Sequence, residues 1–165
     1  MGNNIPLNQE VNTSGQGKNA LIPREVKRFN WGAFFFTWIW GLVNKSYLTL
    51  ISLALWAISF VVPFIFGFGA GLSGNETAYA VGTGFGFIFG IISSLIGLGL
   101  RIWFGIKGND WAWQNKHWQS TEHFNDVQKI WATVGTVLFI VYIGLILLGF
   151  LGAITALVLP SVIGK

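Results

Sequence analysis

Few side chains in this sequence could take part in acid–base, nucleophilic or metal chemistry. The chain contains two histidines, six acidic residues and no cysteine, which excludes thiol catalysis and cysteine-ligated zinc or iron–sulfur sites. His117 and His123 are six residues apart and do not share a helical face, whereas a metal site needs three or four converging ligands. We therefore expect no metal ion and no cofactor, and both histidines are expected to face solvent or lipid headgroups.

Three of the acidic residues lie close together along the chain. Glu122 and Asp126 are four residues apart and would share one face of a helix, with Asp110 nearby. A paired-carboxylate hydrolase needs two acids that converge in a cleft, whereas a solvated helix face explains the same spacing. We predict no catalytic residue and no enzymatic activity. The alternative is a membrane-surface enzyme that acts on lipid through residues 109–126.

The elements that must position these side chains are predicted by the spacing of the charges. Four runs contain no Asp, Glu, Lys or Arg: 29–44, 46–75, 77–100 and 130–164. A bilayer core about 30 Å thick needs about 20 apolar residues in a helix, so the last three runs are long enough to cross it and the first is too short. We predict an all-α membrane protein with three transmembrane helices, over residues 47–70, 79–103 and 130–159.

The short run 29–44 is predicted to form one aromatic helix in the membrane interface. Small or polar residues recur along it at spacings of three and four, which places them in one narrow stripe: Asn30, Ala33, Thr37, Gly41 and Asn44. The other faces carry phenylalanines together with Trp31, Trp38 and Trp40, which suits an anchor with its aromatic side in lipid. The alternative is that the stripe packs on the helical bundle.

Two polar segments flank the first two predicted spans. Residues 1–28 have the composition of a flexible tail, and Lys27 and Arg28 at its end are expected to contact anionic lipid headgroups. Residues 107–129 are predicted to form a cytoplasmic amphipathic helical segment that begins with Asn109 as its N-cap. Its tryptophans are expected at the membrane interface or on a partner surface: Trp111, Trp113 and Trp118.

A row of glycines marks one face of the second predicted span. Gly82, Gly86 and Gly90 recur every four residues, and Gly97 extends the same face. Small residues at this spacing let two membrane helices approach closely. We predict a helix–helix seam here, against the first span, the third span or another chain. The alternative is the general tolerance of membrane helices for glycine.

The basic residues are distributed unevenly around the spans. Nine of the ten Lys and Arg residues precede the first span or lie within residues 101–129, and the loop between the first two spans has none. Because cytoplasmic loops carry an excess of Lys and Arg, we predict that the N-terminus and residues 101–129 are cytoplasmic and that the C-terminus lies outside.

Two stretches of the sequence resemble the signatures of a family of small bacterial integral membrane proteins with no established activity. They are Gly15-Gln-Gly-Lys-Asn19 followed by Asn30-Trp-Gly-Ala-Phe-Phe35 and Trp38-Ile-Trp-Gly41, and then Gly105-Ile-Lys-Gly-Asn-Asp-Trp-Ala-Trp-Gln-Asn-Lys116. The resemblance implies a bacterial cytoplasmic membrane. Some members of that family carry a ribonuclease G label, but this sequence shows no RNA-binding barrel, basic groove or metal-binding acid cluster, so we expect no nucleic acid partner.

The predicted spans contain no charged residue apart from Arg101 at the end of one. Ionisable residues within spans usually mark ion or proton routes, so their absence argues against a proton relay. We predict a non-enzymatic accessory or scaffold subunit of a larger membrane assembly. Its expected partners are membrane lipids and other membrane subunits or further copies of the chain. The alternative is a small homo-oligomeric channel or transporter component.

Overall fold

The computed structural model describes residues 12–163, with side chains as far as Ala156, and this part of the chain is helical without any strand. Three helices are long and apolar enough to cross a membrane. They are α3 (Ile51–Leu72), α4 (Glu76–Asn115) and α5 (Thr121–Ile163). The predicted all-α fold is confirmed, and its three long apolar helices indicate a multi-pass membrane protein. The part of the predicted tail before residue 12 lies outside the described residues.

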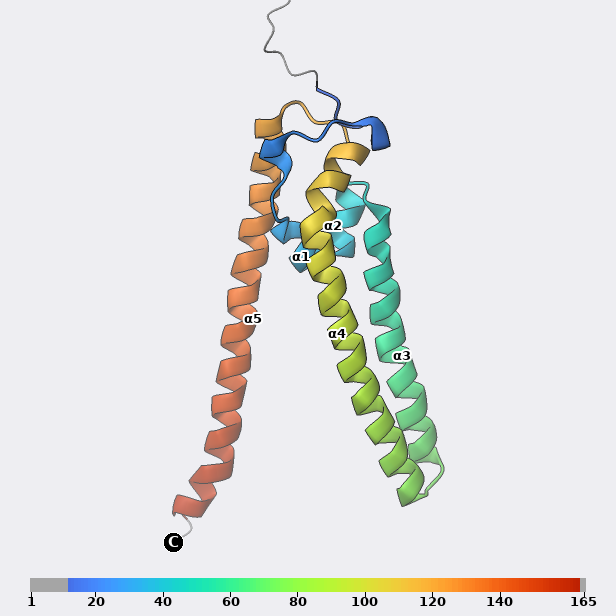
Figure 1. Ribbon diagram of the computed structural model, residues 1–165. Coiled ribbons are helices and arrows are strands. Elements are labelled where there is room, and N and C mark those ends of the chain that lie inside the picture. Colours follow the sequence, from blue (N-terminus) through green and yellow to red (C-terminus); the bar gives the residue numbers. More distant parts are fainter. Residues whose placement is uncertain (1–11, 164–165) are drawn as a thin grey trace, which may run out of the picture.

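The short elements gather at one end of the long helices (Figure 1). They are η1 (Gly17–Asn19), η2 (Arg24–Val26), α1 (Trp31–Phe36), α2 (Trp38–Val43) and η3 (Tyr47–Leu50). We call residues 12–50 and 104–131 the headpiece. Every fully buried apolar side chain of the described part belongs to it, including Trp40, Trp113 and Phe124. The headpiece is therefore the folded core of the protein.

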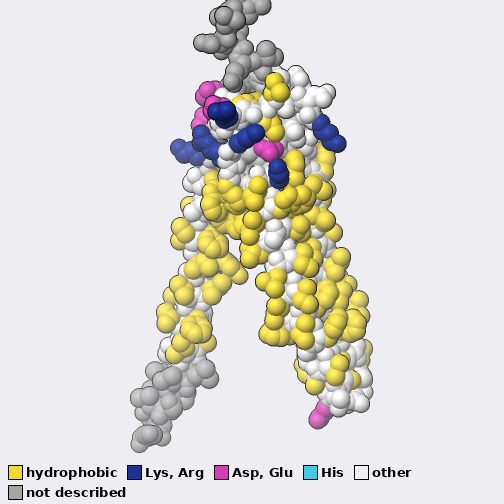
Figure 2. All heavy atoms as spheres, viewed as in Figure 1, with side chains coloured by type: hydrophobic (Ala, Val, Ile, Leu, Met, Phe, Trp, Pro, Cys, Tyr) yellow, Lys and Arg dark blue, Asp and Glu magenta, His cyan; other side chains and the backbone are white. Residues whose placement is uncertain are grey.

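Below the headpiece the chain forms two separate arms. One arm is the hairpin of α3 and α4, which pack along each other. The other arm is α5, which packs on α1 in the headpiece and then diverges from the hairpin (Figures 1 and 2). No residue in the most apolar 18-residue window of α5 is buried. Exposing these apolar side chains to water would be costly, but exposing them to lipid tails is not, because lipid tails are as apolar as leucine.

Two of the long helices are longer than a bilayer crossing requires and continue into the headpiece. α4 has 40 residues and α5 has 43, or about 60 Å at 1.5 Å per residue. The predicted amphipathic segment 107–129 is helical over most of its length but is not a separate element: it consists of the end of α4, a short loop and the start of α5. The sequence also allowed a helix to restart at Ser120 or Thr121 and lead into the third span, and α5 does begin at Thr121. Asn109 lies inside α4 rather than at an N-cap. The cap of α4 is Asn75, whose side chain accepts from the backbone N–H of Thr77 and of Ala78.

The prediction of one interfacial helix over residues 29–44 is also wrong. The segment breaks at Thr37, whose φ is +42°, into α1 and α2. The whole small-or-polar stripe from Asn30 to Asn44 is buried, and α1 packs against both α4 and α5. The structure thus has the alternative arrangement, in which the stripe packs on the bundle. Small side chains allow this: a Cβ on Gly32 would lie 2.6 Å from Cβ of Trp131.

Residues 12–28 pack on the rest of the headpiece and do not form the predicted flexible tail. The backbone N–H of Gly15 donates to the Trp113 carbonyl at 2.9 Å, and the side chains of Ala20 and Val26 are part of the buried core. The composition of this segment is polar, but Ala20 and Val26 enter the same core and help to hold the segment in place.

Candidate functional site: a cavity between the headpiece and the arms

A network of buried amides joins the elements of the headpiece. Its centre is Gln128 on α5, whose Oε1 accepts from Nδ2 of Asn30 at 3.1 Å and from Nε1 of Trp40 at 2.8 Å. The Nε2 group of Gln128 donates to Oδ1 of Asn44 at 3.1 Å. The side chain of this one residue thus fixes α5 to both ends of the segment that contains α1 and α2.

The network continues from α1 to α4 through Asn30. Its Nδ2 also donates to Oδ1 of Asn109, and Nδ2 of Asn109 donates to the carbonyls of Val26 and Arg28, each at 3.0 Å. Among the described residues, no buried side-chain nitrogen or oxygen lacks a hydrogen-bond partner. A fully satisfied buried network of this kind specifies one arrangement of its elements, so the angle between α5 and the hairpin is set in the headpiece.

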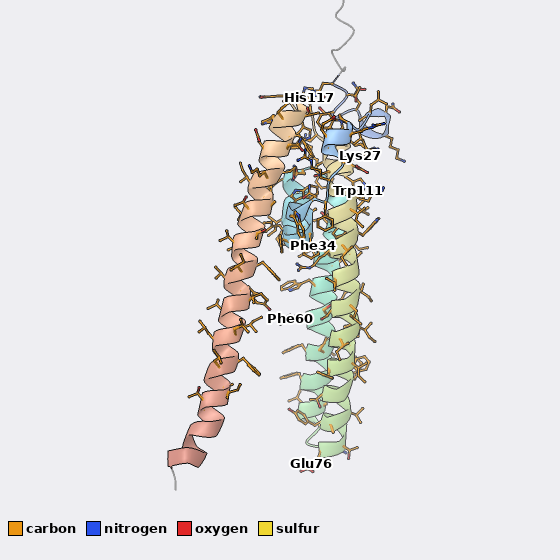
Figure 3. The ribbon with its side chains drawn as sticks, turned by 60° about the vertical axis from the view of Figure 1, so that its left-hand side comes forward. Lys27, Phe34, Phe60, Glu76, Trp111 and His117 are labelled. Carbon is orange, nitrogen blue, oxygen red and sulfur yellow. The ribbon has the colours of Figure 1, made fainter. Side chains whose placement is uncertain are left out.

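A cavity of about 600 Å³ opens where the headpiece meets the two arms. The segment containing α1 and α2 forms its roof, α3 and α4 form one wall, and α5 contributes Phe139. Figure 3 shows Phe34, one of the lining residues, between the arms at their junction. The lining is mostly aromatic and aliphatic, but six polar side chains interrupt it: Thr37, Ser52, Ser59, Ser93, Ser94 and Arg101.

The hydroxyl groups of the cavity differ in their hydrogen bonding. Ser52, Ser59 and Ser94 each donate to a carbonyl of the preceding turn, at 2.7 to 2.8 Å, which is the usual solution for a serine in an apolar helix. The side chains of Thr37 and Ser93 make no hydrogen bond within the described part of the chain, although both residues are more than nine-tenths buried. Both can donate to a group that enters the cavity.

Arg101 is the one charged residue of the lining. Its guanidinium makes a single long hydrogen bond, from Nη1 to the Phe35 carbonyl at 3.4 Å. The only ion pair within residues 12–163 joins Lys107 to Asp110, at 3.7 Å, so no carboxylate of this part of the chain neutralises Arg101. Most of its five N–H donors are free.

The tryptophans predicted for the interface or a partner surface lie in several environments. Trp31 is about half exposed, Trp38 lines the cavity and Trp111 is partly buried. The prediction is wrong for Trp40, Trp113 and Trp118, which are buried in the headpiece. Their indole N–H groups find internal acceptors: Trp40 donates to Gln128, Trp113 to the Leu21 carbonyl, and Trp118 to the Ala112 carbonyl. Lys27 and Arg28 are exposed.

The titratable residues weighed for catalysis do not come together. Nδ1 of His117 lies 3.2 Å from the Ser14 carbonyl, and His123 is exposed beside Trp118. Over residues 12–163 there is no group of three His, Cys, Asp or Glu residues that could hold a metal ion. Glu122 is fully exposed, and the donation of its own backbone N–H and of the Ser120 hydroxyl holds the pKa of Glu122 below its usual value.

The glycine face of α4 lies partly against α3. A Cβ on Gly82 would lie 2.8 Å from Cβ of Ala70, and a Cβ on Gly86 would lie 3.4 Å from that of Pro63. Gly97 is at ordinary contact distance from Leu55, whereas a Cβ on Gly90 would meet nothing within 4 Å. The close part of the seam is therefore within the hairpin, and Gly90 instead lines the cavity.

Sequence reasoning singled out neither Gln128 nor the serines of the cavity, and it assigned Thr37 and Arg101 to no common site. A signal for Gln128 was present, because it lies on the same helical face as Phe124 and Trp131, at spacings of four and three. Ser93, Gly97 and Arg101 are likewise spaced by four, which places two polar side chains on one face of an apolar helix.

Comparisons of this chain with protein-family models, with curated proteins and with solved structures find no match. The resemblance to a family of small bacterial membrane proteins stays a prediction.

Proposed function

We propose that this protein is a non-enzymatic accessory or scaffold subunit of a larger membrane assembly. The observation that carries this proposal is the contrast between the headpiece and α5. The headpiece fixes α5 through a satisfied network of buried amides, yet no residue in the most apolar stretch of α5 is buried. A helix that served only as an anchor would not need its direction fixed. A helix that presents a surface to other membrane helices would need a fixed direction.

The lower half of α5 offers a surface suited to helix packing. An added Cβ would meet nothing within 4 Å at Gly144, Gly149 or Gly152. Association of helices in lipid depends on close van der Waals contact, which small residues permit. Gly135, higher on the same helix, already receives the ring of Phe35, which illustrates the kind of contact that the open glycines can make with another subunit.

The proposal places the protein in the cytoplasmic membrane of a bacterium, with the headpiece in the cytoplasm. All nine Lys and Arg side chains of the described part belong to the headpiece or lie at its lower border, and they gather at that end of the molecule in Figure 2. This is the asymmetry of the positive-inside rule. Because the chain has no cysteine, an Asn115→Cys variant gives a clean labelling test. Reaction of this cysteine with an impermeant reagent from outside intact cells would show that the orientation is the opposite of the one proposed.

Cross-linking from two opposite faces of α5 tests the subunit role. Phe139 points toward the α1 side, because its ring lies 5.6 Å from that of Phe35. At 100° per residue, Ile146 lies on the same face as Phe139 and Leu148 lies on the opposite face. Gly144 and Gly152 lie within about 40° of Leu148 around the helix. We therefore expect a photoreactive residue at position 148 to give one adduct with a different membrane protein, and the same residue at position 146 to give much less of it.

The outcome also separates the alternatives. A fixed stoichiometry of the two chains after purification would support the subunit role. An adduct between two copies of this chain would instead favour the alternative, a homo-oligomeric channel or transporter component. A monomer that cross-links only to lipid from both positions, in membrane particles extracted without detergent, would overturn the proposal.

A further inference from the structure

We propose that the cavity below α1 and α2 binds the phosphate-bearing headgroup of an anionic membrane phospholipid. In this arrangement Arg101 contacts the phosphate, and the acyl chains lie down the space between α5 and the hairpin. The inference uses only residues of this chain and does not depend on the subunit role proposed above.

The position of Arg101 along α4 corresponds to the headgroup layer. It follows Glu76, the first residue of α4, by 25 residues, which is about 38 Å of helix at 1.5 Å per residue. A bilayer is about 30 Å thick in its hydrocarbon core and about 40–45 Å including the headgroup regions. Figure 3 shows Glu76 at the tip of the hairpin. With this tip at one membrane surface, Arg101 lies among the phosphates of the other leaflet.

The direction of the Arg101 side chain brings its charge to the cavity. Side chains on a helix lean toward the N-terminus, so Arg101 leans toward the preceding turns, from which Gly97 and Ser93 line the same cavity. Its guanidinium has no carboxylate partner in the described residues and makes only the long hydrogen bond to Phe35. A phosphate can accept two parallel N–H bonds from a guanidinium.

The remaining free polar groups of the cavity are suited to an anion. Thr37 and Ser93 are largely buried residues, but their hydroxyls open onto the cavity and have no internal partner, so these O–H groups can donate to phosphate or ester oxygens. No Asp or Glu lines the cavity. A site that combines one guanidinium and free hydroxyl donors without any acid favours an anion and disfavours a cation.

The apolar part of the lining indicates that the anion carries hydrocarbon. Phe34, Leu55 and Leu98 form walls of the cavity, and Phe139 lies across from them on α5. A volume of about 600 Å³ is within the range of pockets that bind organic ligands of several hundred daltons. A soluble phosphate would leave these walls unfilled, whereas a phospholipid satisfies the charge and the apolar surface together.

Native mass spectrometry of the full-length protein in a mild detergent tests the inference. The protein is titrated with phosphatidylglycerol and with phosphatidylcholine of the same acyl chains. We expect one phosphatidylglycerol per chain, bound at least about tenfold more tightly than phosphatidylcholine. Loss of a hydrogen-bonded charge typically weakens an interaction by about tenfold or more, so Arg101→Gln should lower the affinity for phosphatidylglycerol by that factor.

Two further variants make the result specific. Lys129→Gln removes the same charge from an exposed position on α5 outside the cavity, and it should leave the affinity unchanged. Gly90→Leu places a leucine side chain in the cavity without changing any charge. The backbone tolerates the change because a Cβ at Gly90 meets nothing within 4 Å, and the variant should abolish lipid retention. It serves as the test if Arg101→Gln does not fold, which tryptophan fluorescence would report.

Three results would overturn the inference. The first is equal binding of the two lipids to the wild-type protein, and the second is an equal loss of phosphatidylglycerol in Arg101→Gln and Lys129→Gln, which would mean general surface charge. The third is displacement of phosphatidylglycerol by millimolar inorganic phosphate, which would assign the cavity to a soluble anion.

Discussion

Replacement of Gln128 by leucine tests whether the buried amides of the headpiece fix α5. The change keeps the side-chain size but removes the acceptor of the Trp40 indole N–H and the donor to the side-chain Oδ1 of Asn44. Asn30 keeps its bond to Asn109. Each buried polar group that loses its partner costs about 1–3 kcal/mol, so two such groups lower the free energy of unfolding of the headpiece by roughly 2–6 kcal/mol.

Guanidinium chloride unfolding in a mild detergent, followed by tryptophan fluorescence, measures this loss. Gln119→Leu is the matched control, because Gln119 is exposed and its side chain makes no hydrogen bond, and surface changes of this kind usually stay within about 0.5 kcal/mol. A loss for Gln128→Leu no larger than that of the control would refute the reasoning.

A distance measurement shows whether the loosened headpiece also releases α5. Spin labels at Leu148→Cys on α5 and Phe87→Cys on α4 report the separation of the arms, and both positions are exposed. We expect a narrow distance distribution with Gln128 and a broad one with leucine. A narrow distribution in both would mean that packing of α1 on α5, rather than the amides, sets the direction of the arm.

Three further predictions concern single positions in or near the headpiece. Thr37 has a φ of +42°, so Thr37→Gly should unfold at a higher denaturant concentration than Thr37→Ala, by about 1 kcal/mol or more in free energy; equal values would mean that the break is unstrained. Gly32→Ala forces a Cβ to within 2.6 Å of a tryptophan carbon and should cost about 1–3 kcal/mol, whereas Gly144→Ala, with open space around it, should cost nothing. The lowered pKa of Glu122 means that its contribution to stability is present above its unfolded pKa and is lost as the pH falls through the folded pKa. Ser120→Ala should raise the pKa of Glu122 in an NMR titration, and an unchanged value would show that the backbone N–H alone sustains it.

The amino-acid sequence by itself determined the membrane part of this protein. A segment crosses a bilayer if it is long enough, apolar and helical, and each of these properties can be read from the segment alone. The three long charge-free runs accordingly correspond to α3, α4 and α5. The charge-free runs did not show how far α4 and α5 continue into the headpiece, because a helix in water is sustained by packing that the local sequence does not reveal.

Only the tertiary structure decided the headpiece and the cavity. Gln128 and Asn30 are 98 residues apart and become hydrogen-bond partners only when α5 packs on α1. An amide on a helix has the same local pattern whether it faces water or completes a buried network, so the sequence alone could not place it. The same holds for Arg101 and Ser93: they line a cavity because the turn at Thr37 brings α1 and α2 over them, and that turn breaks a segment whose periodicity predicts a continuous helix.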